Sequence, residues 1–171
     1  DLDVKFDYLL KTHARNLGVE LTFKTVREQF LELIENAAKS HQQKVVVLVD
    51  EYDKPILDNI NNPDLAIEMR EGLKNFYSVI KDSDQYIKFV FITGVSKFSK
   101  VSLFSGLNNL EDITLNSSFG AICGYTEEEL TEVFSDILDG VDMTKVRTWY
   151  NGYNWLGKKV YNPFDILLFL K

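Results

Sequence analysis

The stretch Lys44-Val45-Val46-Val47-Leu48-Val49-Asp50-Glu51 decides the fold. An unbroken run of aliphatic residues ends abruptly at two carboxylates. Such a continuous apolar run is typical of a strand buried on both faces of a parallel α/β sheet. Side chains at the carboxyl end of the strand point into the crevice where open α/β sheets bind ligands. The stretch therefore predicts a parallel sheet with Asp50 and Glu51 at its ligand-binding edge.

The rest of the first two thirds alternates between helical and strand patterns. A second apolar run, Tyr86–Ile92, ends at Thr93 and Gly94 and predicts a second strand. Apolar residues at helical spacing predict helices over 2–17, after the capping pattern of Thr25 and Glu28, and over 64–81. This alternation predicts an α/β fold with flanking helices. Two further short strands are expected, at 113–115 and 121–123.

From Gly124 onward the pattern becomes mostly helical. Thr126 and Glu129 form a capping-box pattern, a further helix is expected over about 143–150, and 153–161 predicts a hairpin. Asn162 and Pro163 suit the start of a last helix, which we expect to continue beyond Lys171. We therefore expect a core over residues 1–123 and a small helical subdomain over residues 124–171.

Composition excludes several classes of protein. The 171 residues include 12 Phe and 8 Tyr, which argues against disorder. No apolar run is long enough to span a membrane, and the single Cys123 excludes an internal disulfide and a cysteine-based zinc site. A net charge of −7 disfavours binding of nucleic acid by this segment. A cytoplasmic protein without a membrane partner is the simplest expectation.

The acids at the strand end suit magnesium and water chemistry. Mg²⁺ prefers one or two carboxylates together with waters and phosphate oxygens, so Asp50 could hold it while Glu51 orients a water. The alternative is a strand that simply ends in a polar turn. Asp53 could add to this site, although an N-cap of the segment 54–59 is favoured. Thr93 could sense a phosphate, or its hydroxyl could bond its own backbone.

Other polar and aromatic segments favour ordinary structural interpretations. The Ser- and Lys-rich stretch 96–100 could meet phosphate, but a solvated loop is favoured. The aromatic stretch 149–155 is expected to pack a small subdomain rather than to stack on bases, because it lacks neighbouring basic residues.

The sequence contains no phosphate-binding loop of the form G-x-x-x-x-G-K-[ST]. Its Gly157-Lys158 pair is followed by Lys159 and has no matching glycine before it. In P-loop enzymes this loop precedes the strand that ends in acids, so we expect it upstream of Asp1 in a longer protein.

Taken together, the segments resemble the AAA-ATPase-like family of bacterial P-loop ATPases. The resemblance runs from about residue 25 to the end. It is carried by the blocks 46–56, 91–102, 104–110, 124–130, 149–153 and 161–164.

The resemblance implies a P-loop NTPase-type parallel sheet whose N-terminal strand and P-loop lie outside this chain, plus a small helical lid. It assigns Asp50 as the Walker B aspartate for the metal, Glu51 as the catalytic acid and Thr93 as a sensor-type residue. It also implies Mg²⁺ and ATP as ligands of the longer protein, with neither bound to this chain alone. A nuclease-like domain beyond Lys171 is common in the family and would be the route to any nucleic-acid partner.

The expected function is the Walker B and sensor portion of a Mg²⁺-dependent ATPase whose hydrolysis drives a conformational switch. By itself this portion is expected to be inactive. The alternative is a non-catalytic interaction or regulatory module on a degenerate P-loop fold. A metal-dependent nuclease is disfavoured by the acidity of the segment. Without a neighbouring P-loop strand, Val45–Val49 would present an unprotected apolar edge, so self-association is also expected.

The missing phosphate loop predicts that this chain binds ATP weakly or not at all. That loop normally supplies most of the backbone N–H contacts and the lysine charge that hold the phosphates. Isothermal calorimetry with Mg-ATP checks this, and a micromolar dissociation constant would contradict it.

Overall fold

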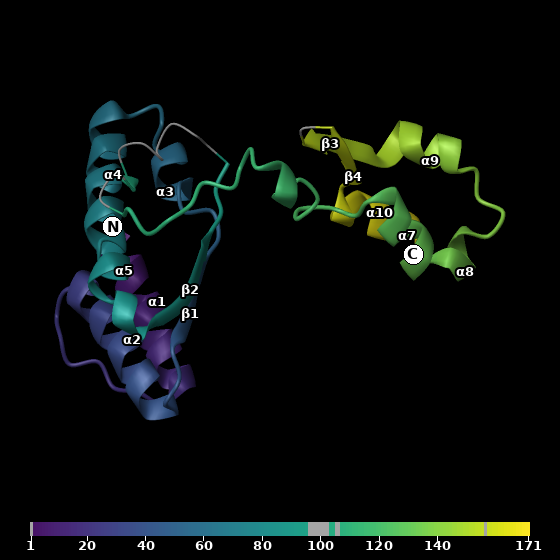
Figure 1. Ribbon diagram of the computed structural model, residues 1–171. Coiled ribbons are helices and arrows are strands. Elements are labelled where there is room, and N and C mark those ends of the chain that lie inside the picture. Colours follow the sequence, from purple (N-terminus) through teal and green to yellow (C-terminus); the bar gives the residue numbers. More distant parts are fainter. Residues whose placement is uncertain (1, 96–102, 105–106, 156) are drawn as a thin grey trace. The chain divides into compact units, whose positions relative to one another are not determined.

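The computed structural model describes residues 2–95, 103–104, 107–155 and 157–171 (Figure 1). The chain divides into two compact units, Asp1–Leu110 and Glu111–Lys171. The division thus falls between Leu110 and Glu111, ahead of the boundary expected at Gly124, because residues 111–123 make their contacts with the second unit.

The first unit alternates helices and strands as the sequence predicts. Its elements are α1 (Leu2–Leu17), α2 (Val26–His41), β1 (Val45–Val49), α3 (Lys54–Leu57), α4 (Pro63–Tyr77), α5 (Val79–Asp82), the 3₁₀ turn η1 (Asp84–Tyr86) and β2 (Ile87–Ile92).

The helix ends follow local chemistry. The Thr25 side chain accepts a hydrogen bond from the Glu28 amide and begins α2, as its capping pattern predicts. The helix expected over 64–81 is divided instead. The Ser78 hydroxyl donates to the Asn75 carbonyl at 2.7 Å, and α5 begins at the next residue. A serine that bonds back to a nearby carbonyl competes with regular helical geometry, which accounts for the break.

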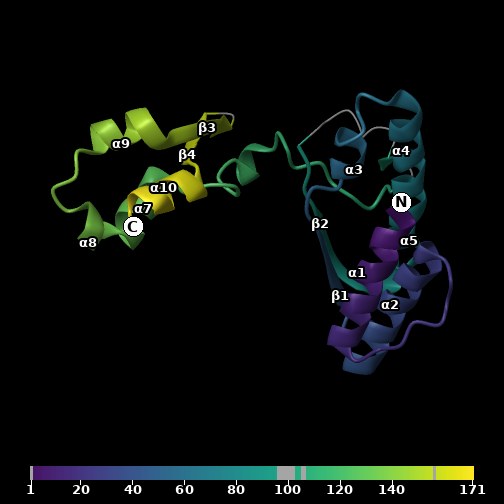
Figure 2. The same ribbon diagram turned by 180° about the vertical axis from the view of Figure 1, so that it is seen from behind.

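Strands β1 and β2 pair in parallel, with Val47 opposite Val90 and Val49 opposite Ile92. Helices α1, α2 and α4 lie on one side of the two strands in both opposed views (Figure 1, Figure 2). The core between this layer and the strands contains Phe30, Ile34, Val47, Leu73, Phe76, Val79 and Ile80. The described part of the first unit is therefore an α/β layer structure with a small parallel sheet and flanking helices.

Among the residues that the structure describes, none covers the second face of β1, which contradicts the expectation of a strand buried on both faces. Val47 is buried, whereas Val46 and Leu48 on the opposite face are 49% and 71% exposed. On β2, Phe89 is 54% exposed and stacks on Phe91. The sequence pattern identified the strand correctly. However, the described helices cover only one of its faces, so an apolar sheet face reaches the surface.

The second unit is a small helical structure with one hairpin. Its elements are the 3₁₀ turn η2 (Ser117–Phe119), α7 (Glu127–Val133), α8 (Ser135–Leu138), α9 (Met143–Tyr150), β3 (Asn151–Trp155), β4 (Lys158–Tyr161) and α10 (Pro163–Phe169). The capping box of Thr126 and Glu129, the hairpin and the Asn162 cap are confirmed.

The strands expected at 113–115 and 121–123 are wrong, because both segments form turns or irregular structure. Side-chain oxygens of Asp112 and Asn116 each accept the backbone N–H two residues later, at 2.9 and 3.0 Å. Such Asx turns satisfy the backbone locally and replace the ladder hydrogen bonds of a strand.

A polar contact, largely exposed to solvent, joins three elements of the second unit. The Arg147 guanidinium donates to both carboxylate oxygens of Glu127, at 2.7 and 2.8 Å, and the Tyr161 hydroxyl donates to the same carboxylate at 3.2 Å. These bonds to Arg147 lower the pKa of Glu127, whereas burial and the nearby Glu127 charge raise the pKa of Tyr161 to about 12. The contact ties α7 and α9 to β4 over a core of Leu130 and Ile166. Within the described residues, no helix combines the length and apolarity needed to cross a membrane.

The uncovered sheet face predicts that this chain binds a hydrophobic dye and self-associates. We expect Leu48→Thr to lower both signals, because it removes an exposed apolar side chain while keeping a good strand former. Lys88→Thr, at an exposed polar position of β2, is the control. Dye fluorescence and light scattering across micromolar concentrations measure the effect. A monomer that binds no dye would show that this face is covered.

Candidate functional site

The parallel register brings the carboxyl ends of β1 and β2 together. Val49 lies opposite Ile92, so the chain leaves both strands at the same edge of the sheet. The Thr93 amide donates to the Val49 carbonyl at 2.8 Å, and the Tyr52 amide donates to the Thr93 carbonyl at 3.0 Å. The segments that follow the two strands are therefore held side by side beyond the sheet.

The predicted site residues Asp50 and Thr93 meet at this edge. The Thr93 hydroxyl donates to the Asp50 carboxylate at 2.5 Å. The hydroxyl thus bonds a carboxylate from the neighbouring strand rather than its own backbone. This hydrogen bond fixes the direction in which the Asp50 carboxylate points.

Glu51 occupies an unusual backbone conformation directly beside this pair. Its φ is 50°, in the left-handed region that a non-glycine residue adopts only at a cost. The turn reverses the chain between β1 and α3, and the Glu51 side chain is exposed. Two adjacent acids therefore stand at the strand end, one held by Thr93 and one open to solvent.

Asp53 stands at the N-cap position of α3, as expected, but its side chain makes no capping hydrogen bond there. Its carboxylate is completely buried and accepts the Val95 amide at 3.1 and 3.3 Å. The amide of Val95 follows β2, so the bond links the loop after β1 to the loop after β2. This partner could not be predicted from residue types, because the donor is a backbone amide.

Gly94 allows the two loops to approach closely. A Cβ atom at this position would lie 2.3 and 2.6 Å from ring atoms of Tyr52 and 2.8 Å from Oδ1 of Asp53. In the sequence pattern, Gly94 marks only the end of a strand. Its role is to leave room for a buried tyrosine ring and a buried carboxylate.

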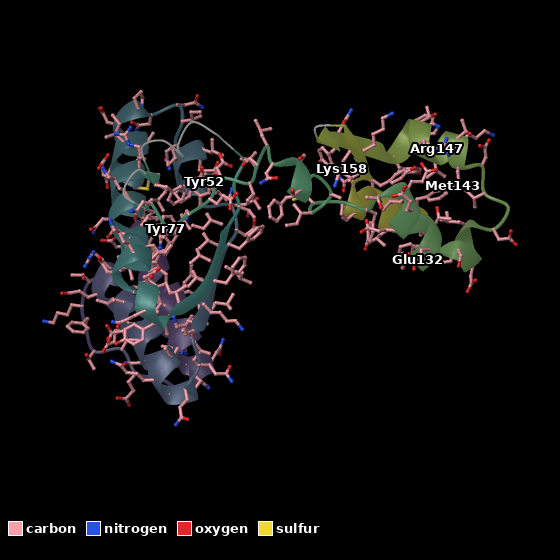
Figure 3. All side chains as sticks on the ribbon, viewed as in Figure 1. Tyr52, Tyr77, Glu132, Met143, Arg147 and Lys158 are labelled. Atoms are coloured by element: carbon pink, nitrogen blue, oxygen red, sulfur yellow. The ribbon has the colours of Figure 1, made fainter. Side chains whose placement is uncertain are left out.

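Two buried tyrosines close the inner side of the site (Figure 3). Tyr52 contacts Phe104, and Tyr77 on α4 contacts the same ring. Burial raises the pKa of Tyr77 far above its usual range, and the nearby Tyr52 and Asp53 add to this effect. The Tyr77 hydroxyl thus stays protonated at neutral pH.

A mostly apolar groove of about 520 Å³ runs along β1 and reaches the two acids. Its lining includes Leu9, His13 and Leu17 of α1, residues 45–52, and core side chains such as Phe30 and Leu73. The groove is therefore open beside the strand that carries Asp50 and Glu51.

The described residues include no cluster of three or more His, Cys, Asp or Glu side chains able to enclose a metal ion. This arrangement does not fit zinc or calcium cages, which need several protein ligands. An exposed Asp50 with its orientation fixed fits Mg²⁺, which keeps most of its waters and takes few carboxylates. The Ser- and Lys-rich stretch 96–100 lies outside the described residues.

The fold and this edge define a class: an α/β protein with polar groups gathered at the carboxyl ends of parallel strands. A protein-family model described as "Predicted AAA-ATPase" matches residues 1–104, and the chain belongs to that family. The resemblance noted from the sequence is thereby confirmed.

A curated relative from Azotobacter chroococcum mcd 1 is described as "Uncharacterized protein in vnfD 5'region". It is 55% identical over 168 residues, which cover 98% of this chain and 33% of the relative. The chain thus spans about a third of the length of that protein. No solved structure matches this chain.

The close approach at Gly94 predicts that Gly94→Ala destabilises the first unit. The added methyl would overlap a buried ring and a buried carboxylate, and overpacking of this kind costs about 1–3 kcal/mol. Gly72→Ala in α4 is the matched control, because its Cβ meets only the flexible end of Leu2, at 3.1 Å. Urea unfolding of both variants measures the difference. Equal midpoints would contradict the packing argument.

Proposed function

We propose that this chain forms the Walker B and sensor portion of a Mg²⁺-dependent ATPase with a P-loop-type sheet. The observation that carries the proposal is the hydrogen bond between Thr93 and Asp50 at the carboxyl ends of two parallel strands. Membership of the predicted AAA-ATPase family supports it independently.

In this proposal Asp50 would hold Mg²⁺, and the Thr93 hydroxyl would orient the carboxylate. Glu51, exposed at the adjacent turn, orients the water that attacks the γ-phosphate in line. The division of roles follows the geometry: the acid fixed by a hydrogen bond serves the metal, and the solvent-facing acid serves the water. Mg²⁺ supplies charge neutralisation on the phosphates when it is bound.

The phosphates need a further element. The chain contains no phosphate-binding loop, so another part of a longer protein would supply the backbone N–H groups and the lysine. The relative of which this chain matches a third has room for such a part. The second unit would serve as a helical lid, and the nucleotide cycle would drive a conformational switch.

The second candidate is a non-catalytic interaction module. The uncovered face with Val46, Leu48 and Phe89 favours it, since exposed apolar patches mark interaction sites. In that case the acids would serve only to end the strand and turn the chain.

Glu51→Gln separates the two candidates. In a longer protein that joins this chain to a phosphate-binding loop, we expect kcat to fall on the order of 10²-fold or more while Mg-ATP binding is kept. Glutamine preserves the shape of the side chain but cannot polarise the water as a carboxylate does. Glu68→Gln, at an exposed position of α4, is the control. Hydrolysis by Glu51→Gln at the parental rate would favour the interaction module.

A further inference from the structure

Asp53 is a buried carboxylate that the proposed ATPase roles leave unused. Among the buried residues that the structure describes, the polar ones are Gln29, Asp53 and Ser83, and of these only Asp53 is ionisable. Burying a carboxylate is costly unless hydrogen bonds compensate. A side chain that merely filled this space would be more favourable if it were apolar. The burial of Asp53 is therefore explained by the groups to which its carboxylate is hydrogen-bonded.

The carboxylate holds the Val95 amide, and this bond is the outermost of three strand-end ties. The first tie joins the Thr93 amide to the Val49 carbonyl, and the second joins the Tyr52 amide to the Thr93 carbonyl. The third is the pair of contacts from the Val95 amide to Asp53, at 3.1 and 3.3 Å. Thr93 itself makes the first two ties, through its amide and its carbonyl, and the Asp53 tie holds the chain two residues further on.

Packing makes the third tie rigid. Gly94 has no side chain, and the Tyr52 ring and Asp53 fill the space where a Cβ would lie. Tyr52 and Asp53 are both buried, and the rings of Phe104 and Tyr77 lie behind them. Movement of residues 93–95 away from β1 would require this buried group to lose its amide donor.

We propose that Asp53 is a positioning residue that acts through Thr93: it fixes the segment 93–95 so that the Thr93 hydroxyl reaches Asp50. The proposal rests on the proposed ATPase function of this edge. Without the tie, Thr93 keeps its own two backbone bonds, but the segment after it is released and the Thr93 hydroxyl is held less closely against Asp50. A displacement of about 1 Å at a reacting centre can cost roughly 10²-fold in rate.

The first test compares Asp53→Ala and Asp53→Asn in a longer protein that joins this chain to a phosphate-binding loop. We expect Asp53→Ala to lower kcat by about 10- to 100-fold, with KM for Mg-ATP changed by less than about threefold. Asparagine keeps an oxygen that can accept the Val95 amide, so Asp53→Asn should recover part of the rate. Asp58→Ala, at an exposed aspartate paired with Lys54, is the control and should keep the parental kcat.

A double-mutant cycle with Thr93→Val separates positioning from general destabilisation. If Asp53 acts through Thr93, the Asp53→Ala/Thr93→Val variant loses no more rate than the more damaged single variant. Losses that multiply would overturn the proposal, as would a parental kcat in Asp53→Ala.

Hydrogen exchange tests the tie without relying on activity. In this chain we expect the Val95 amide to exchange at least about tenfold faster in Asp53→Ala than in the parent, with the amides of α2 unchanged. Because removal of a buried group could unfold the first unit, Asp53→Asn provides the same comparison with the shape of the side chain kept. Unchanged exchange at Val95 in a folded variant would refute the tie. If instead Val95 exchange responds but Glu51→Gln and Thr93→Val leave hydrolysis intact, the tie stands and the ATPase assignment fails.

Discussion

The parallel pairing of β1 with β2 is the constraint on which the rest of the first unit depends. Parallel strands place their carboxyl ends at one edge, and the register of Val49 with Ile92 puts the next residues of both strands within hydrogen-bonding reach. Asp50 and Thr93 are 43 residues apart in sequence, yet they form a short hydrogen bond. A shift of the register by one residue would turn the side chains beyond each strand to the opposite face and separate them.

In the described residues, a layer of helices packs against only one face of the paired strands β1 and β2. Val47 packs against this layer, whereas Leu48 on the other face does not. Purely parallel sheets are normally covered on both faces. In the described residues, this sheet therefore differs from that rule, with one apolar face at the surface and a groove along β1.

The sequence was informative wherever the signal was local. Apolar runs gave both strands, helical spacing gave α1 and α2, and capping patterns at Thr25 and Thr126 gave helix starts correctly. Predictions from local patterns were wrong where a side chain forms a hydrogen bond with the nearby backbone. At Ser78 such a bond divides a helix, and at Asp112 a turn replaces a strand. The prediction that β1 is buried on both faces was wrong for a different reason. The composition of β1 records that both faces are apolar, but not which residues of the molecule cover them.

The residues of the candidate site also fall into those with a local sequence signal and those without one. The acids at the end of the apolar strand could be predicted as site residues from their residue type and position. The structure brings Asp50 and Thr93 together. Asp53, Gly94 and Tyr52 could not be found in this way, because their contacts depend on a backbone amide and on the space left by an absent side chain. Residues that react carry ionisable or hydrogen-bonding side chains, so their residue types identify them as candidates in the sequence. Residues that position these reactive side chains act through burial and main-chain contacts. They can be identified only once the register of the paired strands is known.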